Sequence, residues 1–259
     1  MYTIKETNFK EIDIYKKDYY KNLLAPMDDM WEEGILPNCT YFLIKSENSD
    51  GFFAIDEENV LVSFYSNNIC DDLFIYILKK MNINKAYVSS YDPIFYNQCI
   101  KNKKSISINT MLFHETDLIL NTLAHNNINY KLANNDDFDH TVDYYFNKIG
   151  ESDDWLKPYL TKLIKNKGLY LFKINEQIIG TGEVRKSISS KNYVNIGMTV
   201  SKDFRKRGIA TYIIATIKQI YNKKNLKTIC STTIDNIGSQ KTLLKCGYEN
   251  YHNIYNVYF

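Results

Sequence analysis

Glycine and proline are scarce in this sequence: its 259 residues include ten glycines and four prolines, against twenty-two tyrosines and thirteen phenylalanines. So few turn-forming residues exclude a collagen-like or low-complexity chain and leave little room for flexible linkers. The aromatic residues indicate large hydrophobic cores, and the length permits two domains. Hydrophobic residues make up 44% and charged residues 24% of the chain, as is typical of a soluble globular protein.

The sequence also lacks an excess of one charge. Lysine and arginine number 32 and aspartate and glutamate 30, a net charge of +2, which gives no reason to expect a nucleic-acid partner. No apolar run approaches the roughly 20 residues that span a bilayer. The first residues lack the apolar segment of a signal peptide. We therefore expect a cytoplasmic protein without a membrane partner, either a monomer or a homodimer.

Cysteines are few, odd in number and widely spaced, and none forms a CxxC pair. This pattern predicts reduced thiols rather than a disulfide framework, and no metal site. The five positions are Cys39, Cys70, Cys99, Cys230 and Cys246.

What the sequence does contain is one order of hydrophobic patterns that occurs twice: strand, strand, strand, helix, strand, helix, strand. The first series has strands 41–44, 52–55, 59–65, 86–89 and 105–113, with helices 70–81 and 93–101. The second has strands 170–174, 178–184, 193–200, 228–231 and 248–259, with helices 209–221 and 236–245. Outside them we expect helices 8–24 and 136–148, a short helix and loop within 26–39, a strand at 130–133, an ambiguous segment at 118–124, and a helix capped by Ser152 or Asp153 that runs to about 166.

The fold class is therefore α/β, or α+β in some schemes. It consists of two similar halves, each a mixed, mainly antiparallel sheet flanked by helices. We place the boundary between residues 1–118 and 119–259.

A short basic loop separates the strand at 193–200 from the helix at 209–221. It reads Arg205-Lys206-Arg207-Gly208-Ile209-Ala210. A glycine loop that opens a helix presents several backbone N–H groups to one point, and such an arrangement favours a phosphate or pyrophosphate.

This loop resembles motif A of the GNAT superfamily of acyl-CoA-dependent N-acyltransferases, Gln/Arg-x-x-Gly-x-Gly/Ala, with Arg205, Gly208 and Ala210 in the fixed positions. Residues 236–248 resemble motif B of the same family, in which an asparagine opens a short helix that ends in glycine and an aromatic residue. The resemblance implies a degenerate GNAT-like domain at 1–118 and an acetyltransferase domain at 119–259. In the first half the matching loop has no glycine and no cation, and Asp71 and Asp72 repel an anion there, so only the second half is expected to bind a cofactor.

By this resemblance the co-substrate is acetyl-CoA. Its pyrophosphate would lie on the basic loop, and its pantetheine arm along the end of the preceding strand and beside the motif B helix. Asn236 also suits a helix N-cap, and Ser239 a helix surface. The implied cofactor-binding residues are Met198, Thr199, Val200, Arg205, Lys206, Arg207, Gly208, Ile209, Ala210, Asn236 and Ser239.

The catalytic residues are less defined. The family often places a glutamate on the strand before motif A, but that strand has no acid here. Strand alternation puts Glu183 on one face with Thr181 and Arg185. It is therefore the candidate base or amine-binding group, with a glutamate paired to arginine as the alternative.

The general acid is open as well. Leu243 occupies the position of the tyrosine that many family members use as general acid. Tyr248, Ser231 or a water molecule remain as candidates. Cys246 and His252 are expected to be structural.

The resemblance implies transfer of an acetyl group from acetyl-CoA to a primary amine of a small molecule, by direct attack in a ternary complex. The alternative is a catalytically inactive module that senses acyl-CoA. Aminoacyl transfer from charged tRNA is disfavoured by the near-neutral charge. About a dozen residues follow Gly247, enough for one strand where the family has two. We therefore predict that the two halves share a continuous or closely abutting sheet, with the N-terminal half as one wall of the substrate cleft.

Overall fold

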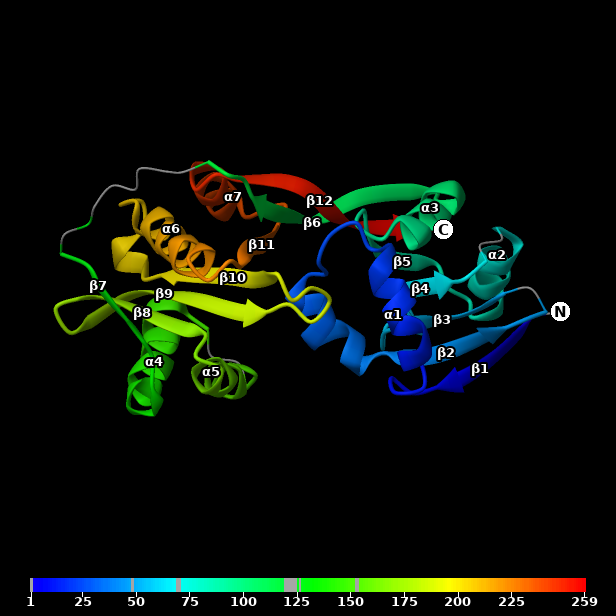
Figure 1. Cartoon of the computed structure of the whole chain (residues 1–259), viewed down its shortest axis with the longest axis horizontal. Coiled ribbons are helices and arrows are strands. Elements are labelled where there is room, and N and C mark those ends of the chain that lie inside the picture. Colours follow the sequence, from blue (N-terminus) through cyan, green and yellow to red (C-terminus); the bar gives the residue numbers. More distant parts are fainter. Residues whose placement is uncertain (1, 48, 69–70, 119–124, 126, 152–153) are drawn as a thin grey trace.

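A computed structural model describes residues 2–259 except 48, 69–70, 119–124, 126 and 152–153. Within these residues twelve strands form one continuous sheet, in the order β1-β2-β3-β4-β5-β12-β6-β11-β10-β9-β8-β7. Two lobes share this sheet (Figure 1). The prediction of a shared sheet is therefore confirmed, as is the mixed, mainly antiparallel α/β class.

The first lobe holds the N-terminal strands and the end of the chain. Strand β1 was not indicated by the sequence pattern, because only one of its five residues is apolar, yet it pairs antiparallel with β2. The other elements follow the predicted order. They are β1 (Thr3–Thr7), α1 (Asp13–Asn22), the π-helical turn η1 (Trp31–Ile35), the 3₁₀ turn η2 (Leu36–Asn38), β2 (Thr40–Lys45), β3 (Asp50–Ile55), β4 (Leu61–Ser66), α2 (Asp71–Lys80), β5 (Lys85–Ser89), α3 (Pro93–Asn102) and β6 (Ser105–Glu115).

The second lobe contains the predicted second series. The predicted helix 136–148 is divided into η3, α4 and a π-helical turn, η4. The proposed cap of α5 at Ser152 or Asp153 and most of segment 118–124 lie outside the described residues. The elements are β7 (Asn129–Leu132), η3 (Asn135–Asp137), α4 (Phe138–Tyr144), η4 (Tyr145–Ile149), α5 (Leu156–Lys165), β8 (Leu169–Ile174), β9 (Gln177–Lys186), β10 (Tyr193–Val200), η5 (Lys202–Phe204), α6 (Ile209–Asn222), β11 (Lys227–Thr233), α7 (Ile237–Lys245) and β12 (Tyr248–Tyr258).

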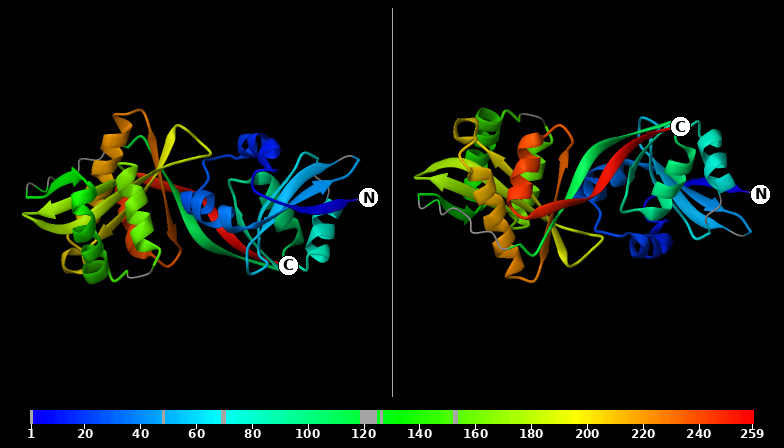
Figure 2. Two further views of the ribbon diagram at one scale, coloured as in Figure 1. Left: turned by 90° about the horizontal axis from the view of Figure 1, so that it is seen from below. Right: turned by 90° about the horizontal axis from the view of Figure 1, so that it is seen from above.

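The lobes are joined by an exchange of strands. Strand β6 lies between β11 and β12, so it supplies the strand that the second half lacks. Strand β12 in turn pairs with β5 of the first lobe. Both strands run side by side between the lobes (Figure 2). The predicted boundary at 118/119 therefore divides the chain but not the sheet.

Helices cover both faces of the second lobe, and alternation along β8 shows why. Leu169 and Leu171 pack with α4 and α5, whereas Tyr170 and Phe172 pack in the cluster that contains α6. Helix α6 approaches β9 closely, because a Cβ at Gly180 would lie 2.6 Å from Cδ1 of Ile213. The glycines of β9 thus allow α6 to lie flat on the sheet.

Candidate active site

The basic loop has the shape of an anion-binding nest. Lys206 and Gly208 have left-handed φ angles of 61° and 79°, and Gly208 directly precedes α6. The amides of the first turn of α6, including Ile209 and Ala210, have no preceding helical carbonyl to donate to. Arg205 is exposed on the loop, and its Nε donates to the carbonyl oxygen of Val200 at 3.2 Å. The loop therefore offers backbone donors, positive charge and a helix N-terminus together.

Strands β10 and β11 separate just before this loop. Their parallel register covers only Tyr193–Asn195 of β10, whereas the pairing of β10 with β9 continues to Val200. The edge of β10 that carries Met198 and Thr199 therefore faces an opening between strands. Such an edge offers backbone donors and acceptors to an extended ligand with amide groups.

A cleft of about 660 Å³ lies at this opening. The second lobe supplies side chains from β9, β10, β11, η4, α5 and α7, and the first lobe supplies residues of segment 29–34. Both π-helical turns, η1 and η4, border it, and π-helical turns frequently mark functional sites. Of the residues predicted from sequence, it brings together Glu183, Met198, Thr199, Asn236 and Ser239.

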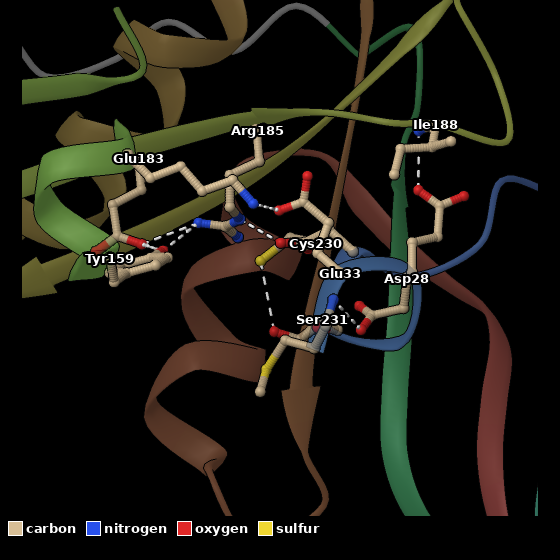
Figure 3. Close-up of polar contacts among 12 residues, drawn as sticks. Asp28, Glu33, Tyr159, Glu183, Arg185, Ile188, Cys230 and Ser231 are labelled. Carbon is tan, nitrogen blue, oxygen red and sulfur yellow. Dashed lines mark hydrogen bonds and ion pairs between the residues drawn. The ribbon is translucent and has the colours of Figure 1, made fainter. Parts of the chain in front are cut away.

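Glu183 is buried in the cleft at the centre of a hydrogen-bond network. Tyr145 Oη donates to its Oε1 at 2.5 Å, and Tyr159 Oη donates to its Oε2 at 2.5 Å. Arg185 Nη1 donates to the same Oε2 at 2.9 Å and to Tyr159 Oη at 2.8 Å (Figure 3). Glu183 therefore pairs with an arginine, as one of the two alternatives expected from the sequence has it. It also faces the cleft, as the other alternative, a base or amine-binding group, requires.

The two tyrosines were not singled out in the sequence. They come from different elements, Tyr145 from η4 and Tyr159 from α5, and only the fold brings both to Glu183. Burial, followed by the charge of Glu183, raises the pKa of both hydroxyls, so each keeps its proton and donates it to the carboxylate.

The first lobe closes the cleft with an acidic segment. Asp29 forms a buried ion pair with Nε of Arg185. Burial disfavours the charge of Arg185, but the carboxylates of Asp29 and Glu183 outweigh this effect, and the pKa of Arg185 lies well above its usual value. Next to it, burial and the charge of Asp29 raise the pKa of Asp28 to about 6.

Glu32 fixes the same segment to the second lobe. Its carboxylate accepts a hydrogen bond from the backbone N–H of Ile188 at 2.8 Å (Figure 3). It accepts a second one from the backbone N–H of Ser189 at 2.7 Å. The backbone N–H of Met27 donates to Ser189 Oγ at 2.9 Å. Glu33 pairs with Nζ of Lys162 at 2.7 Å. The acidic run 28–33 was the only sequence signal for this wall, and it does not indicate the partners.

The remaining candidates differ in their position relative to the cleft. Tyr248 is 1% exposed, hydrogen-bonds to Thr228 and does not line the cleft. Leu243 and Ser231 do line it. Burial raises the pKa of the Cys246 thiol to about 12, consistent with a structural role.

Motif B has the predicted local structure. Asn236 caps α7, where its side chain accepts from the N–H of Ser239 at 3.1 Å. Gly247 follows α7 with a left-handed φ of 69°. Asn236 therefore serves as a cap and also borders the cleft.

A splayed β10–β11 pair, a basic loop at the start of a helix and a cleft containing a carboxylate define an acyltransferase of the GNAT type. The family model for the "Acetyltransferase (GNAT) domain" matches residues 8–116, and the model for the "Acetyltransferase (GNAT) family" matches residues 134–248. The chain therefore belongs to the GNAT acetyltransferase family and contains two such domains. No curated protein matches it in sequence.

Solved structures agree on the fold along the whole chain. A GNAT-family acetyltransferase from Colwellia psychrerythraea is similar with a TM-score of 0.92 and 23% identity, over 99% of each chain. A GCN5-related N-acetyltransferase from Sphaerobacter thermophilus has a TM-score of 0.67 and 12% identity, over 99% of this chain and 94% of that one. A tandem GNAT protein from the clavulanic acid biosynthesis pathway has a TM-score of 0.61 and 9% identity, over 99% of this chain and 98% of that one.

Across the described residues, no helix combines the length and the apolar character that a membrane span requires. The described cysteines, Cys39, Cys99, Cys230 and Cys246, are free thiols.

Proposed function

We propose that this protein transfers the acetyl group of acetyl-CoA to a primary amine of a small molecule, in a ternary complex and without a covalent enzyme intermediate. One observation carries the proposal: Glu183 faces the same cleft as the open edge of β10, the strand that leads into the basic loop. We also propose that the protein acts in the cytoplasm, as a monomer or homodimer.

The chain's own groups suit coenzyme A. The amides of Arg207, Gly208, Ile209 and Ala210 would hold the pyrophosphate, with Arg205 and Lys206 adding positive charge. The open edge at Met198, Thr199 and Val200 would hold the pantetheine amides. A backbone N–H of this edge would polarise the thioester carbonyl. Asn236 and Ser239 would border the arm from α7.

Glu183 would act as the final proton acceptor, with Tyr159 between it and the amine. The acceptor amine would donate to Tyr159 Oη, which keeps its own proton and donates it in a hydrogen bond to Glu183 Oε2. When the nitrogen attacks the thioester, its proton would pass to Tyr159 while the tyrosine proton passes to Glu183. This two-step transfer leaves Tyr159 neutral, as its raised pKa requires.

The departing thiolate needs a proton as well. Ser231 lines the cleft and would pass a proton from a water molecule to the sulfur, so that its own hydroxyl is restored. Tyr248 stays a prediction as the acid; its burial beside Thr228 does not support the role.

The test is acetyl-CoA consumption against a panel of amines, followed by release of free thiol. We expect turnover by the wild type, a loss of about 10²-fold or more in Glu183→Gln with acetyl-CoA binding intact, and loss of binding in Gly208→Asp. Absence of binding by calorimetry at millimolar acetyl-CoA would overturn the proposal. Binding without turnover of any amine would instead favour the acyl-CoA sensor, a reading that Leu243 at the family's tyrosine position supports.

A further inference from the structure

The acceptor side of the cleft is the part away from the open edge of β10. It lies between segment 29–34 of the first lobe and η4 and α5 of the second, with Glu183 at its inner end. Because the two walls come from different lobes, the packing of the two GNAT domains determines which acceptor amines fit this part of the cleft. Its charges and its apolar surface both indicate one class of amine.

The cations of this lining are already paired. Arg185 is held by Asp29, Glu183 and the hydroxyl of Tyr159, and its side chain is only 16% exposed. Lys162 pairs with Glu33 at 2.7 Å. Among the described lining residues, an acceptor carboxylate or phosphate would thus have to displace an existing carboxylate to reach a cation, and burying an unpaired anion is costly.

Most of the lining carboxylates are already paired as well. Asp29 pairs with Arg185 and Glu33 with Lys162, and Glu183 accepts hydrogen bonds from two tyrosines and from Arg185. The described lining contains two cations, and its carboxylates outnumber them: Asp29, Glu33, Glu151 and Glu183. This excess of negative charge allows one ammonium to join the hydrogen-bond network at Glu183. Among the described lining residues, a second ammonium has only Glu151 as a further carboxylate.

Beyond the network the surface is apolar. Met30 is 68% exposed and Trp155 is 50% exposed, and both line the cleft from opposite lobes. The Trp155 ring lies 5.5 Å from that of Tyr159, in an edge-to-face arrangement. Two large apolar side chains held open to solvent gain free energy when an apolar ligand covers them.

We propose that the acceptor is a primary monoamine attached to an uncharged apolar body, of the arylalkylamine or alkylamine class. Its nitrogen lies at Tyr159 and Glu183, and its body lies between Met30 and Trp155. This inference rests on the proposed acetyl transfer and adds the class of acceptor. It also assigns a role to the first lobe, which would contact the apolar body of the acceptor through Met30.

The experiment compares amines that differ in one charged group, with acetyl-CoA saturating and wild-type full-length protein. Tryptamine is set against tryptophan and phenethylamine against phenylalanine, which add a carboxylate. Hexylamine is set against hexamethylenediamine, which adds an ammonium, and kanamycin represents polar polyamines. We expect kcat/KM at least about tenfold higher for each monoamine than for its charged partner.

Two variants test the position of the apolar body. Trp155→Ala and Met30→Asp are each expected to raise KM for tryptamine about three- to tenfold and to leave KM for acetyl-CoA unchanged. The matched control is Leu244→Ala on α7, which removes another exposed apolar side chain (57%) outside the cleft lining.

The outcomes separate the two proposals. Equal or faster turnover of tryptophan, hexamethylenediamine or kanamycin overturns the acceptor class and leaves acetyl transfer standing. Unchanged KM for tryptamine in both Trp155→Ala and Met30→Asp also overturns the acceptor class and leaves acetyl transfer standing. Turnover of no amine at all removes the acetyl-transfer proposal and this inference with it.

Discussion

Tyr159 donates a 2.5 Å hydrogen bond to Oε2 of Glu183, and Arg185 donates to both partners of this bond. Both oxygens of Glu183 therefore already accept hydrogen bonds before any substrate binds. These hydrogen bonds fix the orientation of the carboxylate. The shortest path for a proton from the amine to Glu183 then runs through a hydroxyl that the carboxylate already contacts.

Tyr159→Phe should lower kcat by about 10²-fold, because it removes the hydroxyl that passes the proton to Glu183. KM for acetyl-CoA should not change, since Tyr159 lies away from the basic loop. Steady-state kinetics with tryptamine measures both values. Tyr170→Phe, which removes a hydroxyl from another buried tyrosine of the second lobe, is the control and should keep wild-type kcat. Equal kcat in the two variants would exclude Tyr159 as the relay.

Glu32→Gln should destabilise the protein by about 1–3 kcal/mol. The buried carboxylate accepts from two backbone amides across the lobes, and charge-assisted bonds of this kind are costly to weaken. Urea denaturation gives the change in free energy of unfolding. Glu33→Gln is the matched control one residue away, because its partner Lys162 is largely exposed and such pairs contribute at most about 1 kcal/mol. Similar midpoints for both variants would contradict the bridging role of Glu32.

Residues 119–259 alone should not fold cooperatively. Strand β12 pairs with β5 and β6, and β11 pairs with β6, so the fragment would lose partners for two strands. Circular dichroism on heating and the dispersion of amide NMR signals test this. Addition of separately produced residues 1–118 should restore a cooperative transition. A soluble, cooperatively unfolding monomer of 119–259 would instead show that the second predicted domain folds without the first.

Asp92 should contribute a fall in the free energy of unfolding between about pH 4 and pH 7. Burial raises the pKa of Asp92 to about 7, against about 3.9 in an unfolded chain. Between these values the folded state binds more protons, so stability is lost as pH rises, by up to about 1.4 kcal/mol per pH unit.

Asp92→Asn should remove this contribution, so that stability falls less, or rises more, with pH than in the wild type; urea denaturation at several pH values measures the difference. Its helix cap on Phe95 would remain, because an asparagine side chain also accepts from the N–H. Asp71→Asn is the control: Asp71 is half-exposed and pairs with Lys101, and its pKa is lowered, so its substitution should leave the slope in place. An unchanged slope in Asp92→Asn would mean that Asp92 is ionised in the folded protein.

What could be read from the sequence was local. The order of strands and helices follows from hydrophobic periodicity, and only β1 escaped it, since its polar residues carry no strand pattern. The basic loop could be identified because its pattern, a glycine among cations between a strand and a helix, is contained in a few adjacent residues; Gly208 has a left-handed φ in the structure. The asparagine cap of α7 was predicted for the same reason.

Tertiary structure decided the rest. The exchange of β6 and β12 between the lobes joins strands more than 130 residues apart in sequence, and no local pattern states which partner a strand will choose. The hydroxyls of Tyr145 and Tyr159 and the carboxylate of Asp29 meet around Glu183 and Arg185 only when η4, α5, β9 and segment 29–34 pack together. The sequence alone therefore determined the conformation of the basic loop, through short-range backbone preferences. The cleft around Glu183 was decided by long-range packing, because its side chains come from distant parts of the chain and contact one another only in the folded protein.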